Sequence, residues 1–476
     1  MRDRKTKLAD ALQRIAGVVG ERGVVPATEA APLLRDYRGI HQGQAALVVQ
    51  PVTTRECAKV IGICAEAEIG VVPQGGNTGY CGGATPFDGE RQILLSLSRM
   101  NRIREIDPVN QTMTVDAGMV LSRVHTAAQE HGLMFPLSLG SEGSCQIGGV
   151  LSTNAGGVAV LRYGNARDLV LGIEAVLPSG EVLSQLKGLR KDNSGYDLKS
   201  LLVGAEGTLG VITAAVLKLV PLPRSRQTGW LAVPTPAAAC AVLRRMQRYS
   251  GERVISAEYI SRPSLELVLQ FVPGARDPLD RPWPHYLLFE VAGGDLESRL
   301  RRTVEEIFQA GLEEREILDG MLAASGRQRD ALWRLRETIP EAERHAGGSV
   351  KHDISVSVSA IAEFMDEAER CLTKLGPCRL SAFGHLGDGN LHYNLRPPPG
   401  SALADFRAGP ARKMTAAVHD LAMRLGGSFS AEHGVGVLKR GELEQYASPV
   451  ALSTMRALKT ALDPKGIMNP GKILEI

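Results

Sequence analysis

The chain of 476 residues has few aromatic side chains, only 4% of its composition, and no long hydrophobic run. A membrane-spanning helix needs about 18 consecutive apolar residues, and no stretch of the sequence reaches that length. Charge of one sign is also absent, because 55 Lys and Arg nearly balance 52 Asp and Glu, giving a net charge of +3. The composition therefore predicts no membrane span and no nucleic-acid partner.

Cysteine is scarce and irregularly placed. The seven cysteines form no CxxC pair, which argues against a disulfide framework, a zinc ribbon and an iron–sulfur site. The first residues contain no apolar segment typical of a signal peptide. We therefore expect a cytoplasmic protein. The cysteines are Cys57, Cys64, Cys81, Cys145, Cys240, Cys371 and Cys378.

Hydrophobic residues make up 44% of the chain, which is enough for two or three globular domains. Short strand-like runs alternate with Gly-rich turns up to Pro221 and Pro223, and longer helices and strands follow. We predict a helical cap over 1–42, one domain over 43–221 and an α/β domain over 222–476. Expected strands are 46–49, 71–72, 93–97, 112–115, 169–176, 211–219, 287–291 and 354–358; expected helices are 54–68, 121–131, 237–249, 296–311, 328–343 and 411–425.

Glycine is in excess, with 52 residues or about 11% against a usual 7%. It gathers in three clusters, 73–79, 140–157 and 204–210. Consecutive glycines can direct several backbone N–H groups at one phosphate, although each cluster alone also fits an ordinary tight turn. Neither a GxGxxG with a following acidic residue nor a GxxxxGK motif occurs, which excludes Rossmann and P-loop sites. The clusters predict a nucleotide cradle of another kind.

Two histidines flank a glycine-rich turn. Gly384, Gly387 and Gly389 disfavour a helix around His385 and His392, so we predict a hairpin with its loop at 387–390. The two imidazoles then lie near each other, and Asn394 projects from the same strand face as His392. With Glu432 as a carboxylate, they could form a zinc-type site with an open position. On spacing alone, ordinary turn or core histidines are the favoured interpretation and the metal site is the alternative.

The order of these motifs resembles the FAD-binding domain of the vanillyl-alcohol-oxidase flavoprotein superfamily. The resemblance rests on 73–79, 82–83, 145–149, 153–157, 161–164, 189–199 and 204–213, and it extends from about residue 43 to 476. It is strongest to the FAD-dependent D-2-hydroxy-acid dehydrogenases. It implies an α+β fold of two domains: a non-Rossmann FAD-binding domain, and an α/β substrate (cap) domain with a C-terminal return segment.

The resemblance also implies which residues hold FAD. Asn77 stands where covalent relatives need a histidine, so we expect non-covalent FAD, with Cys81 and Cys145 as the remaining candidates for attachment. The residues implied for FAD are Gly75, Gly76, Asn77, Thr78, Gly79, Gly140, Ser144, Gly148, Gly149, Asn154, Gly210 and Ile212.

For the reaction, the resemblance implies a divalent metal, Zn²⁺ or Mn²⁺, on His385, His392 and Glu432, with His433 as the base. It further implies that Arg336 and Lys351 anchor the substrate carboxylate, with Asn394 beside them. Without the resemblance, Arg336 and Lys351 fit exposed charges better.

One residue departs from the pattern of the D-2-hydroxyglutarate enzymes. Four positions after the arginine these carry threonine, whereas this chain has Pro340, which offers neither a side-chain donor nor an N–H. The departure affects the choice of acid and leaves the flavin and metal chemistry unaffected.

The resemblance thus implies oxidation of a D-2-hydroxy acid, of the D-2-hydroxyglutarate, D-lactate or D-malate type, to its 2-oxo acid. Electrons would pass to a separate acceptor, such as an electron-transfer flavoprotein or a quinone-linked partner, and the protein would be a homodimer. Alternatives are an oxygen-using oxidase, a non-redox flavin-dependent transferase of the same fold, and a flavin-free metal hydrolase.

Overall fold

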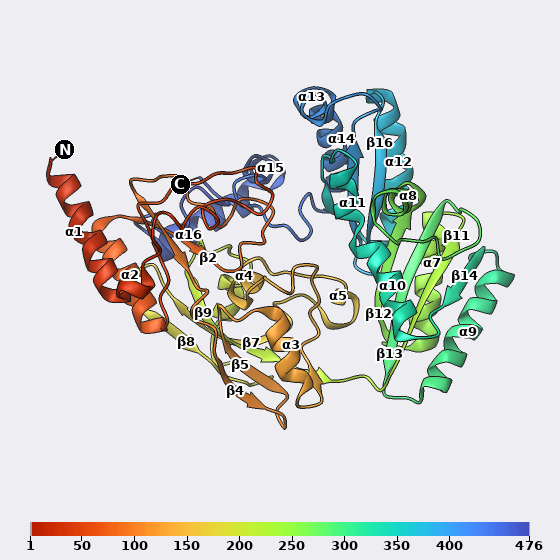
Figure 1. Cartoon of the computed structure of the whole chain (residues 1–476), viewed down its shortest axis with the longest axis horizontal. Helices are drawn as coiled ribbons and strands as arrows, with labels where there is room; N and C mark the ends of the chain where they lie inside the picture. The colour runs from red at the N-terminus through yellow and green to blue at the C-terminus, as the bar shows by residue number, and fades with distance from the viewer. Residues whose placement is uncertain (1, 476) are drawn as a thin grey trace. The chain divides into compact units, whose positions relative to one another are not determined.

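The computed structural model describes residues 2–475 and divides into two compact units. Unit 1 comprises Met1–Gly157, Gly164–Leu222 and Glu432–Ile476, and unit 2 comprises Val158–Tyr163 and Pro223–Ala431. Figure 1 shows the elements of each unit along the chain. Within the described residues, no helix has the length and apolar character needed to span a membrane.

Unit 1 contains short strands and helices. Its elements are α1 (Arg2–Val19), η1 (Glu21–Gly23), β1 (Leu47–Val49), α2 (Thr54–Ala67), β2 (Gly70–Gln74), β3 (Gln92–Ser96), β4 (Ile103–Asp107), β5 (Thr112–Asp116), α3 (Leu121–Gln129), β6 (Leu133–Met134), α4 (Ile147–Ser152), β7 (Val170–Val176), β8 (Val182–Gln185), α6 (Leu198–Leu202), β9 (Val211–Lys218), β10 (Val220–Pro221), α15 (Arg440–Tyr446) and α16 (Pro449–Leu462).

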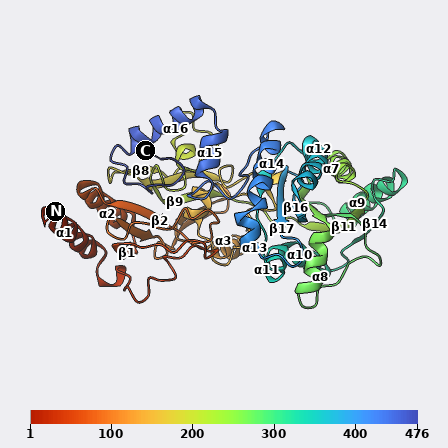
Figure 2. The same ribbon diagram turned by 90° about the horizontal axis from the view of Figure 1, so that it is seen from above.

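The strands of unit 1 form a parallel sheet of order β1-β3-β2, a five-stranded antiparallel sheet of order β4-β5-β9-β7-β8, and the short pair β10-β6. Helices α1 and α2 pack together, and Figure 2 shows them side by side next to the parallel strands. The side chain of Thr53 caps α2 by accepting the N–H of Glu56 at 3.1 Å. Apolar residues of α1, α2 and the parallel strands, among them Ile15, Ile61 and Ile93, form one buried core.

Unit 2 contains longer elements. They are α5 (Val160–Tyr163), β11 (Ser225–Val233), α7 (Pro236–Ser250), β12 (Val254–Ser261), α8 (Arg262–Phe271), β13 (His285–Gly293), α9 (Glu297–Glu313), β14 (Asp319–Leu322), α10 (Gly326–Glu337), α11 (Ile339–His345), β15 (Asp353–Ser355), η2 (Val358–Ala360), α12 (Ile361–Leu375), β16 (Arg379–His385), β17 (Asn390–Arg396), α13 (Leu403–Ala408) and α14 (Pro410–Arg424).

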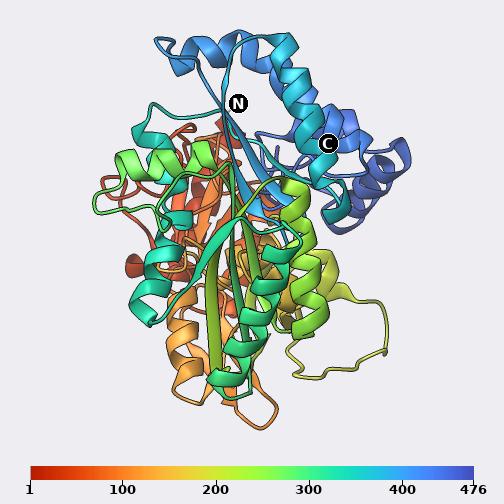
Figure 3. The same ribbon diagram turned by 90° about the vertical axis from the view of Figure 1, so that its right-hand side faces the viewer.

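The core of unit 2 lies on both faces of one seven-stranded sheet, of order β14-β11-β13-β12-β16-β17-β15. Side chains alternate between faces along a strand. Leu231, Tyr259 and Leu287 accordingly pack with α7, α9, α12 and α14, whereas Trp230 and Ile260 pack with α8, α10 and α11. Figure 3 shows helices on either side of these strands. The face covered by α8, α10 and α11 is called the site face below.

The structure contains the expected strands and helices, with three differences. No strand was expected directly after Pro223, but β11 begins at Ser225 and pairs along its whole length with β13. The single helix expected over 328–343 is two helices, because Pro340 lies in the first turn of α11 and lacks the N–H needed to continue α10. The strand expected over 354–358 ends at Ser355 and is followed by η2.

The sequence-based domain division differs from the structural units at the C-terminus. The change near residue 222 falls at the boundary between Leu222 and Pro223, whereas residues from Glu432 onward group with unit 1. This return is fixed by local contacts: Met468 bridges to Val71 of β2, and the ammonium group of Lys459 donates to the carbonyl of Thr208 at 2.7 Å.

Candidate active site

The first two glycine clusters pack directly on each other in unit 1. An added Cβ at Gly76 would lie 2.1 Å from the carbonyl oxygen of Ser144, and one at Gly75 would lie 3.2 Å from the backbone nitrogen of Gly149. Real Cβ atoms essentially never come within 3.0 Å of such an atom, so Gly76 admits no side chain, whereas the contact at Gly75 is tight. Glycine is therefore required for this contact between the two loops.

The third cluster joins the other two. The N–H of Glu206 donates to the carbonyl of Ser152 at 2.8 Å. Gly207 has a φ of +72°, and an added Cβ there would lie 2.4 Å from the ring of Pro73. Three loops that are far apart in sequence thus meet at the end of β2. This arrangement places backbone N–H groups near one another, as a dinucleotide cradle requires.

The remaining residues expected to hold FAD lie in or beside these loops. Asn77 has a φ of +54° and donates its side-chain amide to the carbonyl of Arg35, while the side chain of Asn154 accepts the N–H of Arg167. Thr78, Gly79 and Gly140 lie in loops, Gly148 lies in α4, and Gly210 and Ile212 lie at the start of β9.

The two cysteines near the loops are buried. Cys81 and Cys145 are only 4% and 3% exposed. Burial raises the pKa of the Cys145 thiol, which keeps it protonated and weakly nucleophilic. A buried protonated thiol is a poor group for covalent attachment of a cofactor.

The two histidines lie on the site face of unit 2. The predicted hairpin is present as β16 and β17, in which His385 pairs with Asn390 and Phe383 pairs with His392. The imidazoles therefore sit diagonally on one face, with ring centroids 5.8 Å apart. Asn394 lies on the same face, two residues beyond His392, as expected from strand geometry.

A buried carboxylate organises this part of the site. Glu258 of β12 is 1% exposed. One of its oxygens accepts a hydrogen bond from Nδ1 of His385 at 2.8 Å, and the other accepts one from Nε of Arg336 at 2.8 Å. Burial alone would raise the pKa of Glu258, but the positive charges of His385 and Arg336 outweigh it and lower the pKa to about 2. Glu258 is thus an ionised acceptor that fixes both partners.

A second buried carboxylate, that of Glu343 in α11, accepts hydrogen bonds from two other residues expected to contact the substrate, Lys351 and Asn394. It accepts Nζ of Lys351 at 3.1 Å and the amide of Asn394 at 3.0 Å, and it also accepts the hydroxyl of Ser349. Glu343 is 1% exposed, whereas the Lys351 side chain is 24% exposed. The expected substrate anchors are therefore held from beneath by a carboxylate.

Glu432 and His433 are the first residues of the C-terminal segment of unit 1, which directly follows Ala431, the last residue of unit 2. The chain before them is bonded to β15, since Ala431 donates its N–H to the carbonyl of Asp353 at 3.0 Å. The peptide chain itself therefore carries Glu432 and His433 to the edge of the site face. Within unit 1, Glu432 accepts the N–H of Gly157 at 3.0 Å, and the imidazole of His433 stacks on Tyr80 at 4.6 Å.

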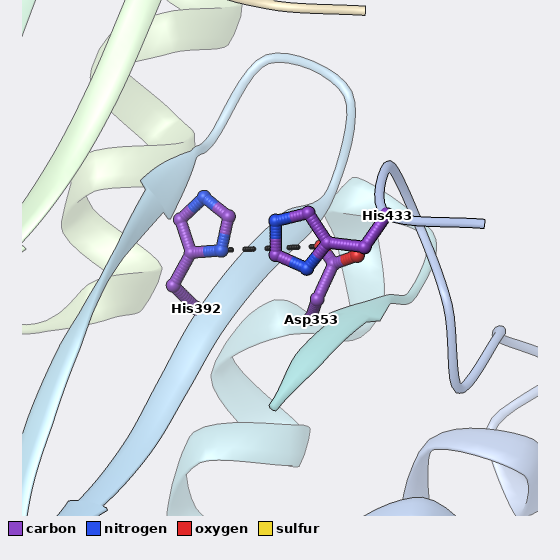
Figure 4. Close-up of side chains that lie close together, drawn as sticks. All are labelled: Asp353, His392 and His433. Atoms are coloured by element: carbon purple, nitrogen blue, oxygen red, sulfur yellow. Dashed lines mark ion pairs between the residues drawn. The ribbon is translucent and has the colours of Figure 1, made fainter. Parts of the chain in front are cut away.

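The ligand atoms of His385, His392 and Glu432 all lie within 4.8 Å of one another. A second group of this kind consists of Asp353, His392 and His433, drawn in Figure 4. In it, Nδ1 of His392 lies 3.9 Å from a carboxylate oxygen of Asp353. The donor set of the first group, two imidazoles and a carboxylate, fits a catalytic divalent metal, and Glu258 orients His385 as an outer carboxylate typically does.

Sequence reasoning missed the residues that hold the site from behind. Glu258 lies 127 positions before His385, and Glu343 was assigned to an amphipathic helix. Tyr80 and Glu206 were also missed. Glu206 accepts the N–H groups of Val435 and Gly436, and burial raises its pKa against these hydrogen bonds. A signal for Glu258 is visible in hindsight: it is a lone acid in the apolar run 254–260.

Comparison with known proteins places this geometry in context. Residues 45–185 match the FAD binding domain family, and residues 222–473 match the family of FAD linked oxidases, C-terminal domain. The D-2-hydroxyglutarate dehydrogenase, mitochondrial, of Arabidopsis thaliana is 36% identical, with 96% of this chain and 80% of the relative covered. The Bos taurus protein of the same name is 37% identical, with 98% and 83% covered.

A solved structure of p-cresol methylhydroxylase shares the fold with a TM-score of 0.75 at 17% identity, covering 99% of this chain and 97% of that chain. The expectation of a cytoplasmic protein is wrong by these comparisons, because the relatives named above are mitochondrial. The predicted two-domain fold and flavoprotein family are confirmed. The chain belongs to the FAD linked oxidases, in the family of the D-2-hydroxyglutarate dehydrogenases.

Proposed function

We propose that this protein oxidises a D-2-hydroxy acid to the 2-oxo acid and passes the electrons to a bound FAD. The observation that carries the proposal is a cluster in unit 2 in which two buried carboxylates, Glu258 and Glu343, hold an imidazole, a guanidinium, an ammonium and an amide. A second imidazole, that of His392, lies beside the first. Relatives at 36% and 37% identity are named D-2-hydroxyglutarate dehydrogenases, which supports the same reaction class here.

Unit 1 would hold the FAD non-covalently. The loops around Gly76, Gly149 and Gly207 fit a dinucleotide because their missing side chains let them pack closely on one another, and such gathered backbone can supply several N–H groups to a phosphate. FAD, when bound, accepts a hydride equivalent from the substrate carbon. The domain over 43–221 is thus the FAD-binding part, and the segment 222–431 supplies the substrate groups.

His385, His392 and Glu432 would hold a divalent metal, Zn²⁺ or Mn²⁺. When bound, the metal supplies a Lewis acid that lowers the pKa of the substrate hydroxyl. Glu258 accepts Nδ1–H of His385, which leaves Nε2 of that ring for the metal. This bond also keeps the ring from turning away.

His433 would take the proton of the substrate hydroxyl at an imidazole nitrogen. A neutral imidazole is suited to this because its ordinary pKa of about 6.5 lies near neutral pH. Its stacking on Tyr80 fixes the plane of the ring. Base catalysis requires the nitrogen to be held in one direction.

Arg336, Lys351 and Asn394 would orient the acid. Nε of Arg336 is used by Glu258, so its terminal N–H groups remain for a bidentate contact with a carboxylate. Lys351 keeps further N–H groups beyond the one given to Glu343, whereas the amide of Asn394 donates to both oxygens of Glu343 and would act by holding that carboxylate in place. Together they would fix the orientation of the acid, so that the D-enantiomer and not the L-enantiomer presents the hydrogen of its C2 for transfer.

The reduced flavin would be reoxidised by a separate acceptor, such as an electron-transfer flavoprotein or a quinone-linked partner, and the protein would act as a homodimer. A flavin-dependent transferase of the same fold is the alternative, and an oxygen-using oxidase is the alternative within the redox class. The pair of imidazoles beside Glu432 favours the oxidation, because a transferase acting on a phosphate ester needs a phosphate site instead.

The test is an anaerobic visible spectrum of the flavin during addition of 2-hydroxy acids of each hand. We expect bleaching of the flavin band by at least one D-acid and by none of the matching L-acids. A yellow protein whose band no D-acid bleaches would refute the proposed oxidation. Rapid reoxidation when air is admitted would favour the oxidase instead.

A further inference from the structure

Asp353 is a buried carboxylate beside the candidate metal ligands, and the proposed function gives it no role. It is 1% exposed and lies in β15, directly opposite His392 of β17 in the antiparallel register. Residues directly opposite each other point to the same face of a sheet. The side chain of Asp353 therefore lies on the site face beside His392, whereas the next residue, Ile354, packs in the core on the other face.

The carboxylate of Asp353 faces a ring nitrogen of His392. Its Oδ1 atom lies 3.9 Å from Nδ1 of His392, as the dashed line in Figure 4 marks. The same oxygen accepts the side-chain amide of Asn390 at 2.9 Å, which holds the carboxylate in this direction. A distance of 3.9 Å is too long for a hydrogen bond, yet a buried carboxylate there attracts an N–H and repels a lone pair. His392 should accordingly carry its proton on Nδ1, which leaves Nε2 for a metal.

His385 has a similar arrangement on the other strand of the hairpin. Its Nδ1 donates at 2.8 Å to Glu258, which is also 1% exposed. Histidines that bind a metal usually give their second ring nitrogen to an outer group such as a carboxylate, which fixes the tautomer and the direction of the ring. Each of the two candidate imidazole ligands thus has a buried carboxylate on its Nδ1 side, one from β12 and one from β15.

The main chain of Asp353 also holds the segment that leads to Glu432, the third candidate ligand. Its carbonyl oxygen accepts the N–H of Ala431 at 3.0 Å, and Asp353 forms a parallel bridge with Ser430. Asp353 therefore faces one ligand with its side chain and binds the chain before another through its backbone. Because a change of the side chain leaves the backbone carbonyl in place, the two contributions can be separated.

We infer that Asp353 is a positioning residue for the metal site, whose carboxylate fixes the tautomer and direction of His392 so that Nε2 of that ring is presented to the metal. The inference rests on the proposed function, because it concerns the metal of that site. The competing arrangement is the group of Asp353, His392 and His433, whose ligand atoms also lie within 4.8 Å of one another. In this competing group Asp353 would itself bind the metal.

The experiment measures the Zn²⁺ affinity of FAD-loaded Asp353→Asn by competition with a chelator. The variant keeps an oxygen for the amide of Asn390 and removes the charge. We expect the affinity to fall by about 10–100-fold, the usual cost of losing an outer carboxylate. FAD content should stay at the wild-type level, and the thermal midpoint of the metal-free protein should not fall. At saturating Zn²⁺ the rate of flavin reduction by a D-acid should return to within a few-fold of wild type, which a disrupted fold would not allow.

The matched control is Asp405→Asn, at an exposed position in α13 of the same unit, which should bind Zn²⁺ like the wild type. His433→Ala should do the same, because His433 is not one of the three proposed ligands. Loss of Zn²⁺ affinity in both Asp353→Asn and His433→Ala would overturn the inference in favour of the competing group. Wild-type affinity in Asp353→Asn would overturn it as well.

The wild type supplies a second test that does not depend on the folding of any variant. In nitrogen NMR of zinc-loaded protein with isotope-labelled histidine, His392 should carry a proton on Nδ1 and the metal on Nε2. The reverse assignment would overturn the inference. A wild type that binds neither Zn²⁺ nor Mn²⁺ would instead refute the metal of the proposed function, and bleaching of the flavin by D-acids tests the oxidation separately.

Discussion

The candidate functional groups of unit 1 belong to the backbone, whereas those of unit 2 belong to side chains. In unit 1 three loops meet through backbone, and glycines at 75, 76 and 207 are there because a side chain would not fit. In unit 2 the groups are side chains, and four of them, His385, Arg336, Lys351 and Asn394, are fixed by the buried carboxylates of Glu258 and Glu343. A backbone cradle is sensitive to added atoms, whereas a side-chain cluster is sensitive to lost charges.

Gly76→Ala should disrupt the contact between the glycine loops of unit 1. The new Cβ would lie 2.1 Å from the carbonyl oxygen of Ser144, so the two loops must separate. Such overpacking typically costs about 1–3 kcal/mol, and we expect most of the FAD and all substrate-driven reduction to be lost. The measurement is flavin absorbance per protein in the purified variant.

The control for this change is Gly441→Ala, an exposed site in α15 where an added Cβ meets nothing within 4 Å. It should retain its FAD. A Gly76→Ala protein with a full complement of FAD would show that the close loop contact is not needed for the cradle.

His433→Ala should leave the backbone cradle intact and remove the proposed base. General-base catalysis contributes about 10²–10⁴-fold, so flavin reduction by a D-acid should slow by that factor while FAD content stays at the wild-type level. Stopped-flow absorbance under anaerobic conditions measures both. His131→Ala, in an exposed turn, is the control. A reduction rate within a few-fold of wild type would exclude His433 as the base.

Glu258→Gln should test whether the buried carboxylate of Glu258 positions the side-chain cluster of unit 2. The amide cannot accept two charged donors equally, so His385 and Arg336 lose their common fixed point. Loss of such an outer carboxylate costs about 10–100-fold in metal affinity or activity. Metal content after dialysis and the flavin-reduction rate should both fall, with FAD content unchanged.

Glu266→Gln is the matched control, since Glu266 is exposed on α8 and pairs only with Arg262. If Glu258→Gln binds metal and reduces its flavin like this control, the carboxylate has no positioning role.

The smallest effect is expected for Lys472→Met in unit 1. Its ammonium group is buried without a carboxylate partner among the described residues, whereas the buried cation Arg336 of unit 2 is paired with Glu258. Lys472 is 2% exposed, donates to the carbonyl of Pro470 and lies over the ring of Phe87; burial lowers its pKa to about 8. An exposed lysine has a pKa of about 10.4, so between these values the unfolded chain binds more protons and the stability rises with pH. Lys472→Met should be more stable than wild type near neutral pH, and the difference should shrink as the pH rises above about 8.

The measurement for Lys472 is the difference in thermal midpoint between variant and wild type at about pH 7 and about pH 9.5. Lys465→Met, at an exposed position, serves as the control and should show no such trend. A difference that does not change with pH would mean that the ammonium is not strained by burial.

The glycine loops of unit 1 could be predicted from the sequence more completely than the side-chain cluster of unit 2. Glycine clusters are local signals, and the hairpin carrying His385 and His392 follows from the glycines between them. Glu258 could not be predicted, because its partners Arg336 and His385 lie 78 and 127 residues away in sequence. Glu343 could not be predicted either, because an acid in a helix is usually exposed. Pro340 was noticed as a missing donor, but its role in dividing α10 from α11 depends on the packing of the sheet face.

The most direct test of the account is removal of the metal from FAD-loaded protein, followed by single-turnover flavin reduction with a D-acid. The account predicts that chelation leaves the flavin spectrum unchanged, abolishes reduction, and that added Zn²⁺ or Mn²⁺ restores it. Reduction at the full rate in protein shown to be metal-free would contradict the division of labour between the glycine loops and the side chains of the site face.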